Sequence, residues 1–167
     1  ILYSIKDIGQ RKANIAQQKL NNINPECNIQ NINSNINIQN INKFLNNSSL
    51  VIDTTDNWKT MILINKYCVK NFIPLISSSA IGFDGQVMIF KNSKKKHLCL
   101  QCVFPNKKEP ILSRCDTVGI AGTAAGMTGL ATAQKAINFL ISNKEDNFMT
   151  MINTKSLKIT NLKLEKN

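Results

Sequence analysis

The pattern of apolar and polar positions predicts a helix followed by a biased tract in the first part of this chain. Apolar residues recur at close to helical spacing over residues 7–23. Asn24-Pro25 ends that helix, because the residue before a proline is displaced from the helical region. The Asn- and Ile-rich tract that follows is interpreted as a strand over residues 28–33 and a short helix over residues 39–45.

A strand–helix–strand unit is predicted next. Residues 50–52 form a short apolar run, which is typical of a strand buried on both faces. Asp56 and Asn57 have side chains suited to capping the helix that follows. A second apolar run occupies residues 74–80, and the succession indicates a βαβ unit with a parallel sheet. Residues 85–90 are predicted to form another strand.

Residues 119–141 are the longest weakly charged stretch, with Lys135 as its only charge. Its length is compatible with a membrane span. Its threonines make it too polar for that, so we expect a buried helix that packs closely through its glycines and no association with a membrane. Residues 149–164 alternate well enough to predict a final hairpin. The predicted fold class is α/β.

Composition is that of a folded domain, with 167 residues of which 43% are hydrophobic. The formal net charge of +11 comes almost entirely from lysine, since Arg11 and Arg114 are the only arginines. Asn, Ile and Lys share adenine- and thymine-rich codons, so base bias is one interpretation and an acidic partner is another. Arginine is the usual reader of bases, and its scarcity argues against a nucleic-acid partner.

The cysteine pattern raises three alternatives for the segment "HLCLQC". Cys99 and Cys102 have the spacing of a redox couple or of half a metal site, and the pair can also be accidental. His97 beside them is a further possible ligand, although a lone loop histidine is more often solvated. Five cysteines form no regular disulfide framework, so a reducing, cytoplasmic setting is expected. Cys27 and Cys68 are expected to be small buried hydrophobes.

Several stretches, in order and in register, resemble one family. They are "ILYSIKDIGQRKA", "VIDTTDN", "GFDGQ", "CLQCVFP" and "RCDTVGIAGTAAGMTGLATAQKAI". The chain resembles the ThiF/MoeB/HesA family of sulfur-carrier adenylyltransferases, which are relatives of ubiquitin-activating enzymes, from Ile1 to about Leu164. The "GFDGQ" and "CLQCVFP" segments place the resemblance closest to the thiamine-biosynthesis branch.

The resemblance implies a Rossmann-like, mostly parallel sheet with flanking helices. Family members have a glycine-rich nucleotide loop before the equivalent of Ile1 and a second Cys-x-x-C after the equivalent of Asn167. We therefore expect residues 1–167 to be a partial adenylyltransferase domain, incomplete at both ends. A crossover loop is expected at about residues 103–118.

The function implied by the resemblance is ATP-dependent adenylylation of the C-terminal glycine carboxylate of a small ubiquitin-like sulfur-carrier protein, for sulfur transfer in thiamine thiazole biosynthesis. One alternative is the molybdopterin-synthase sulfur-carrier adenylyltransferase, and another is a non-catalytic fragment that only binds the carrier. Lys12 matches the family's ATP-binding lysine, and a lysine is a point charge suited to phosphate oxygens. Asp56 matches the aspartate expected to bind Mg²⁺ or orient ATP, with Asn57 beside it, whereas Asp53 is expected to be structural.

The resemblance also assigns roles to three cysteines. Cys115 matches the crossover-loop cysteine that forms a covalent bond with the carrier during sulfur transfer. Cys99 and Cys102 match the first half of a structural four-cysteine zinc site whose second half lies beyond Asn167. Family members are homodimers, and a homodimer is therefore expected here.

Overall fold

A computed structural model describes residues 2–93, 98–105, 119–142 and 147–165 of the chain. The chain divides into two compact units, unit 1 (Ile1–Ile36) and unit 2 (Asn37–Asn167). Unit 1 contains a short 3₁₀ helix, Ile5–Asp7, and helix α1 (Lys12–Ile23). The helix predicted over residues 7–23 is confirmed from Lys12 onward.

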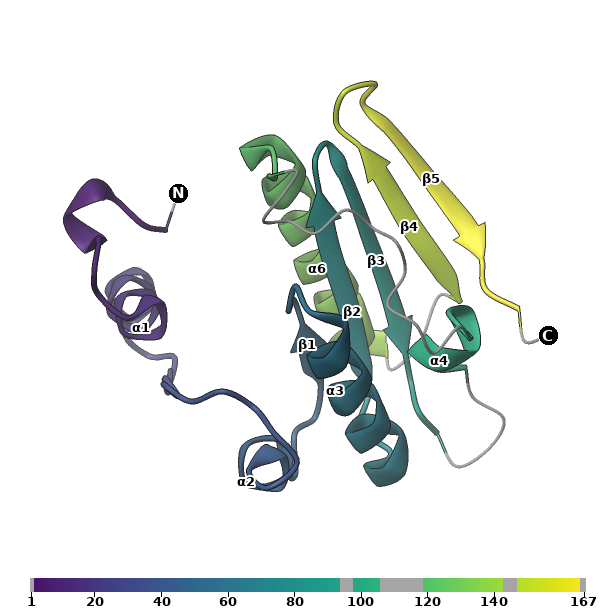
Figure 1. Cartoon of the computed structure of the whole chain (residues 1–167), viewed down its shortest axis with the longest axis horizontal. Coiled ribbons are helices and arrows are strands. Elements are labelled where there is room, and N and C mark those ends of the chain that lie inside the picture. Colours follow the sequence, from purple (N-terminus) through teal and green to yellow (C-terminus); the bar gives the residue numbers. More distant parts are fainter. Residues whose placement is uncertain (1, 94–97, 106–118, 143–146, 166–167) are drawn as a thin grey trace. The chain divides into compact units, whose positions relative to one another are not determined.

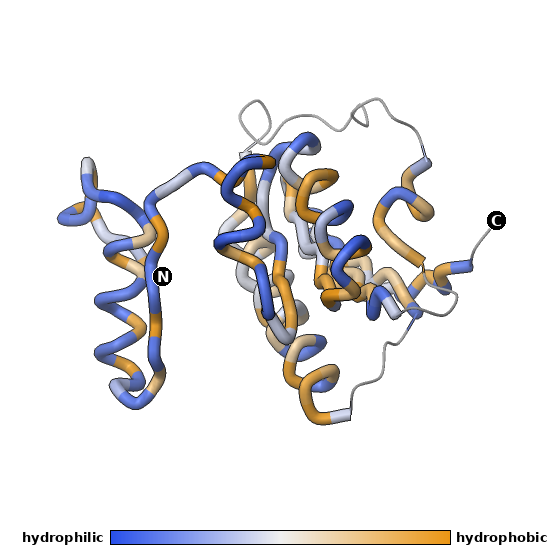
Figure 2. Tube along the Cα trace, turned by 90° about the horizontal axis from the view of Figure 1, so that it is seen from below, coloured by the Kyte–Doolittle hydropathy of each residue, from blue (hydrophilic) through white to orange (hydrophobic). Residues whose placement is uncertain are grey.

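The strand predicted over residues 28–33 is wrong, because this segment is irregular. Amide side chains of α1 hydrogen-bond to this segment, in the place that a neighbouring strand would take. The Gln17 Nε2 group donates to the Ile29 carbonyl oxygen at 2.5 Å, and Asn31 Nδ2 donates to Gln17 Oε1 at 2.5 Å. Asn33 Nδ2 donates to Asn14 Oδ1 at 2.5 Å. Figure 2 shows that hydrophilic residues predominate in α1.

Unit 2 is an α/β unit built on one five-stranded sheet (Figure 1). Its helices are α2 (Ile41–Leu45), α3 (Trp58–Asn71), α4 (Leu100–Val103) and α6 (Gly122–Ser142). Its strands are β1 (Val51–Asp53), β2 (Leu75–Ile81), β3 (Asp84–Phe90), β4 (Phe148–Asn153) and β5 (Lys158–Lys163). The strands lie in the order β1-β2-β3-β4-β5, so the α/β class is confirmed.

The expectation of a mostly parallel sheet is corrected by the pairing. Strands β1 and β2 are parallel and joined through α3, as predicted, whereas the pairs β2–β3, β3–β4 and β4–β5 are antiparallel. The cause lies in the connections. Only Gly82 and Phe83 separate β2 from β3, and a parallel return needs a crossover of about a dozen residues or more. Gly82 has φ +55°, a conformation that favours glycine in a tight turn.

The core of unit 2 lies between the sheet and its helices, and Figure 1 shows α3 and α6 on opposite faces of the sheet. Because side chains alternate along a strand, β2 presents Ile76 and Ser78 to α6 and presents Leu75 and Ser77 to the other face. One cluster on the α6 face contains Ile76, Val87, Ile89, Ala136 and Phe139. The predicted helix at residues 119–141 is thus a core helix, and no described helix is long and apolar enough to span a membrane.

Candidate functional site

Asp56 and Asn57 lie together at the carboxyl end of β1, which is where open α/β sheets place ligands. Strand β1 is fixed by its parallel pairing with β2 and by burial of Val51, which is 6% exposed, and Asp53 in the same strand is 2% exposed. Asn57 caps α3, as predicted, since its Oδ1 accepts from the Thr60 N–H at 2.9 Å. The Asp56 side chain is exposed, and no described residue forms a hydrogen bond or ion pair with it. The carboxylate is therefore available to a ligand.

Asp53 holds the turn that leads to Asp56. Its Oδ1 accepts from the backbone N–H of Thr55 at 2.9 Å and from the Thr55 hydroxyl at 2.7 Å. The other oxygen, Oδ2, is buried and has no hydrogen-bond partner in the part of the chain that the structure describes. Burial raises the pKa of the Asp53 carboxyl, and the bonds from Thr55 act in the opposite direction. Sequence reasoning treated Asp53 as structural and did not find this link to Asp56, although the three-residue spacing after a buried strand is a signal for it.

The donors at the end of β1 fit Mg²⁺ better than a softer metal. Mg²⁺ takes hard oxygen ligands and is commonly bound through one or two carboxylates together with substrate phosphates and water. Asp56 offers such a carboxylate, while the Asn57 oxygen already serves the helix cap. Within the described ranges, no three or more His, Cys, Asp or Glu side chains form a group that could hold a metal ion. Asp56 would hold the ion, and phosphate and water would complete its coordination.

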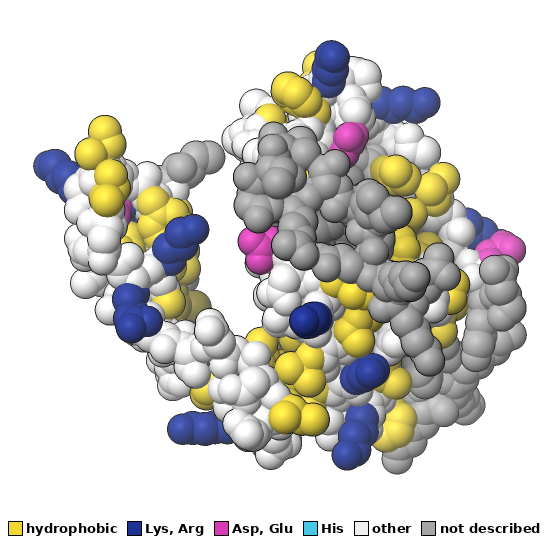
Figure 3. All heavy atoms as spheres, in the orientation of Figure 1, with side chains coloured by type: hydrophobic (Ala, Val, Ile, Leu, Met, Phe, Trp, Pro, Cys, Tyr) yellow, Lys and Arg dark blue, Asp and Glu magenta, His cyan; other side chains and the backbone are white. Residues whose placement is uncertain are grey.

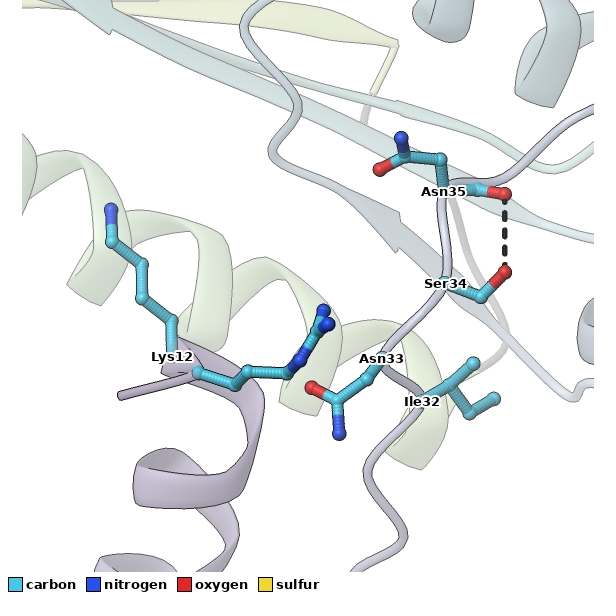
Figure 4. A pocket seen from close by; sticks show the side chains of 6 residues that line it. Lys12, Ile32, Asn33, Ser34 and Asn35 are labelled. Atoms are coloured by element: carbon cyan, nitrogen blue, oxygen red, sulfur yellow. Dashed lines mark hydrogen bonds between the residues drawn. The ribbon is translucent and has the colours of Figure 1, made fainter. Parts of the chain in front are cut away.

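Lys12 lies in unit 1, at the first residue of α1. It lines an open pocket of about 370 Å³ together with Arg11 and residues 32–35. The amino end of α1 has no side-chain cap, and unpaired N–H groups at a helix start attract anions. In Figure 4 the Lys12 ammonium group extends away from the backbone of residues 32–35. The two basic residues of the lining, Arg11 and Lys12, suit an anion such as phosphate. The sequence did not reveal Arg11 and residues 32–35 as neighbours of Lys12, because they meet only in the fold.

Cys99 and Cys102 are brought together, with their Sγ atoms 3.4 Å apart. Their segment is tied to α3, because Asn65 Oδ1 accepts from the backbone N–H of the buried Leu100 at 3.0 Å. The Trp58 and Phe104 rings add an edge-on contact, with centroids 6.2 Å apart. Two thiolates can supply half of a tetrahedral zinc site. His97 lies outside the described residues.

The remaining cysteines differ in environment. Cys115 and residues 106–118 of the expected crossover loop lie outside the described residues. Cys68 is fully buried as expected, and burial, with the Asp53 carboxylate as a second cause, raises its thiol pKa to about 12. The expectation for Cys27 is wrong, because it is exposed after the turn at Pro25.

Charge on the visible surface is mostly positive but dispersed. Figure 3 shows Lys and Arg side chains spread over both units, with few acidic groups among them. Helix α3 carries three exposed lysines, Lys59, Lys66 and Lys70, and no acidic residue of the described ranges forms an ion pair with them. A surface of this kind is compatible with an acidic partner protein.

Comparison with known proteins gives one consistent result. The model of the ThiF family matches residues 1–167. The chain is 32% identical over 140 residues to the sulfur carrier protein ThiS adenylyltransferase of Escherichia coli (strain K12), covering 84% of this chain and 55% of the relative. It is 27% identical over 141 residues to the probable molybdopterin-synthase adenylyltransferase of Gracilaria tenuistipitata var. liui, covering 84% of this chain and 39% of the relative.

Solved structures of the E. coli protein MccB share the fold. The structure of MccB with ATP has a TM-score of 0.78 at 18% identity and covers 100% of this chain and 52% of MccB. The structure of MccB with MccA-N7isoASN has a TM-score of 0.80 at 18% identity, with coverage of 100% and 53%. The chain thus spans about half the length of the proteins that it matches first, 55% of one and 51% of another.

Proposed function

This chain belongs to the ThiF family, and we propose from that premise that the protein adenylylates the C-terminal glycine carboxylate of a small ubiquitin-like sulfur-carrier protein with ATP. The observation that carries the proposal is the exposed carboxylate of Asp56 at the carboxyl end of buried strand β1, with which no residue of the described ranges pairs. Among its relatives, the names of the E. coli and Gracilaria proteins describe adenylyltransferases of sulfur-carrier proteins or of molybdopterin synthase.

The proposed reaction is a displacement at phosphorus. An oxygen of the carrier's terminal carboxylate attacks the α-phosphorus of ATP and forms the acyl-adenylate. The bond from that phosphorus to the oxygen bridging to the β-phosphate breaks, and pyrophosphate leaves. Such a step depends on positioning and on neutralising phosphate charge.

The proposed roles follow from charge and position. Lys12, with Arg11 beside it, binds phosphate oxygens at the amino end of α1. Asp56 holds Mg²⁺, which when bound neutralises charge on the phosphates, and Asn57 keeps the start of α3 in place through its bond to the Thr60 N–H.

ATP–pyrophosphate exchange in the presence of carrier tests the proposal, using the whole natural polypeptide. Asp56→Ala is expected to lower the exchange rate by about 100-fold or more, because it removes a charge acting on the reacting phosphates. Glu26→Gln, which removes an exposed acid in unit 1, is the control for the loss of one negative charge. Wild-type protein that binds carrier without exchange would contradict the proposal and favour the binding-only alternative.

Lys12→Ala is expected to raise the KM for ATP in the same assay, with Lys6→Ala, a change at an exposed lysine of unit 1, as its control.

We further propose the thiamine branch over the molybdopterin branch, on the "GFDGQ" and "CLQCVFP" segments. Exchange measured with a carrier of each branch decides between them. A preference for the molybdopterin-synthase carrier would overturn the thiamine assignment while leaving adenylylation intact.

The cysteines complete the proposal. Cys115 is proposed to bond covalently to the carrier during sulfur transfer, and Cys115→Ser should abolish sulfur transfer but leave exchange intact. Cys99 and Cys102 are proposed to hold two of the four positions of a structural zinc site, so Cys99→Ser should lower the zinc content of the whole protein. We also propose a homodimer in the cytoplasm, which native mass and cell fractionation test.

A further inference from the structure

Strand β1 ends with a buried acid, at a position where burying a neutral side chain would cost less free energy. Asp53 is 2% exposed, and its neighbour across the sheet, Ser77, is 1% exposed. Burying a carboxylate costs roughly several kcal/mol unless hydrogen bonds or an opposite charge offset the lost hydration. Within the described residues, Asp53 Oδ2 and Ser77 Oγ are both buried without a hydrogen-bond partner, so the sheet does not offset the cost of burying the Asp53 carboxylate.

All hydrogen bonds that Asp53 makes among the described residues go to Thr55. One comes from the Thr55 backbone N–H at 2.9 Å and one from its hydroxyl at 2.7 Å, and both end on Oδ1. The carboxyl group therefore binds the turn after β1 rather than β2 or α3. Its position in the core makes it a rigid base for that turn.

The turn is fixed at two points with Asp56 between them. Thr55 is anchored to Asp53 on one side, and Asn57 is anchored to the Thr60 N–H on the other at 2.9 Å. The backbone on both sides of Asp56 is thus already ordered when its carboxylate binds a cation, whereas a free turn would have to be ordered first.

We infer that Asp53 and Thr55 are positioning residues that aim the Asp56 carboxylate at the magnesium–nucleotide complex. The inference rests on the proposed function and adds to it the pair that sets the geometry of the cation ligand. In this proposal Asp53 and Thr55 act through Asp56 rather than by contact with the nucleotide. Their effect is expected on the contribution of Mg²⁺ to ATP binding rather than on ATP binding as such.

The experiment measures ATP affinity by titration calorimetry with and without Mg²⁺, on the whole natural polypeptide, and uses the ratio of the two affinities. Thr55→Val removes the hydroxyl donor at nearly constant shape and is expected to lower the ratio about 10-fold, the effect of roughly 1.4 kcal/mol. Asp53→Val removes the acceptor and should lower it similarly. Thr55→Ser restores the hydroxyl and is expected to return the ratio to within about threefold of wild type.

Two further variants define the range. Thr54→Val makes the same chemical change at the exposed neighbouring position and should leave the ratio unchanged. Asp56→Ala sets the lower limit, where Mg²⁺ no longer strengthens ATP binding. A melting temperature of Thr55→Val within about 2 °C of wild type, alongside the lowered ratio, supports positioning rather than general unfolding.

The outcomes separate this inference from the proposed function. If wild type shows a magnesium-dependent ratio and Thr55→Val behaves like Thr54→Val, the inference fails and the proposed function stands. If Thr55→Val weakens ATP binding equally with and without Mg²⁺, positioning of Asp56 is likewise overturned. If wild type binds no ATP under either condition, the proposed function fails and takes the inference with it.

Discussion

Unit 2 buries a continuous set of aliphatic and aromatic side chains, whereas unit 1 is tied together mainly by amide groups. The largest fully buried side chains all belong to unit 2, and Phe90, Leu75 and Ile76 head the series. In the described part of unit 1, Ile15 is the only buried apolar residue. Residues 29–33 are instead joined to α1 through Asn14 and Gln17.

This difference has an energetic consequence. Apolar burial contributes about 25 cal/mol per Å² and accumulates over a large core. A side-chain hydrogen bond exchanges with water and contributes only about 1 kcal/mol net. Unit 1 is therefore expected to open locally at a lower free energy than unit 2.

The largest effect that would sharpen the comparison is expected at Gly85 of β3, where α6 packs closely on the sheet. A Cβ atom added at Gly85 would lie 1.8 Å from Thr128 Oγ1 and 3.0 Å from Thr128 Cβ. Either the Thr128 side chain or the helix must move, so Gly85→Ala is expected to lower the free energy of unfolding by about 1–3 kcal/mol. Denaturant unfolding of the variant measures the change.

Two controls accompany this variant. Gly129 lies next to Thr128 in α6, and nothing lies within 4 Å of a Cβ atom added there. Gly129→Ala should therefore stabilise the protein by about 0.5–1 kcal/mol. Thr128→Ala combined with Gly85→Ala should recover most of the loss, since Thr128 Oγ1 has no hydrogen-bond partner to forfeit. Equal stabilities of Gly85→Ala and Gly129→Ala would show that the α6–β3 contact is not tight.

The contrast between the units also explains what could be predicted from the sequence. In unit 2 the apolar runs and helical spacing come from real burial, and β1, α3, β2, α6 and the final hairpin were correctly predicted. In unit 1 the two isoleucines of residues 28–33, Ile29 and Ile32, are three residues apart, which is not the two-residue period of a strand. No strand pairs with this segment in the part of the chain that the structure describes. The composition of the segment favoured a strand, but strand pairing depends on the rest of the fold.

The pattern of apolar and polar residues could not predict the direction of the strands or the surroundings of the site, for a similar reason. The run at residues 85–90 indicates a strand, but the two-residue turn at Gly82 decides that β3 runs antiparallel to β2. Asp56 and Asn57 were predicted at the correct end of β1 because capping is a local property. The pocket around Lys12 joins residues about 20 apart in sequence, so the path of the chain had to be known before it could be found.

A smaller effect, confined to unit 1, is expected from Gln17→Ala. The change removes two hydrogen bonds, one to the Ile29 carbonyl oxygen and one from Asn31 Nδ2, and should lower the local opening free energy by about 1–2 kcal/mol. Hydrogen exchange of the α1 amides measures it. Gln18→Ala, at the exposed neighbouring position, should change exchange little or slow it, because alanine favours the helix. Unchanged exchange in Gln17→Ala would mean that apolar contacts at Ile15 hold the unit instead.

The smallest effect is expected from acid. Asp7 Oδ2 accepts from Lys19 Nζ at 2.7 Å, from the Ser4 N–H at 2.7 Å and from the Ser4 hydroxyl at 2.8 Å. The bond to Lys19, followed by those from Ser4, lowers the pKa of Asp7 from 3.8 to about 2. A carboxyl whose pKa is lowered by folding stabilises the folded state above its unfolded pKa, and that contribution is lost as the pH falls through its folded pKa. Protection of unit 1 amides should therefore decline as the pH falls from 3.8 through about 2.

Lys19→Met should move the pKa of Asp7, measured by NMR titration, part of the way back toward 3.8, because the Ser4 bonds remain. An Asp7 pKa that Lys19→Met leaves unchanged would show that the ion pair contributes nothing in solution, and the bonds from Ser4 would then account for the lowered pKa.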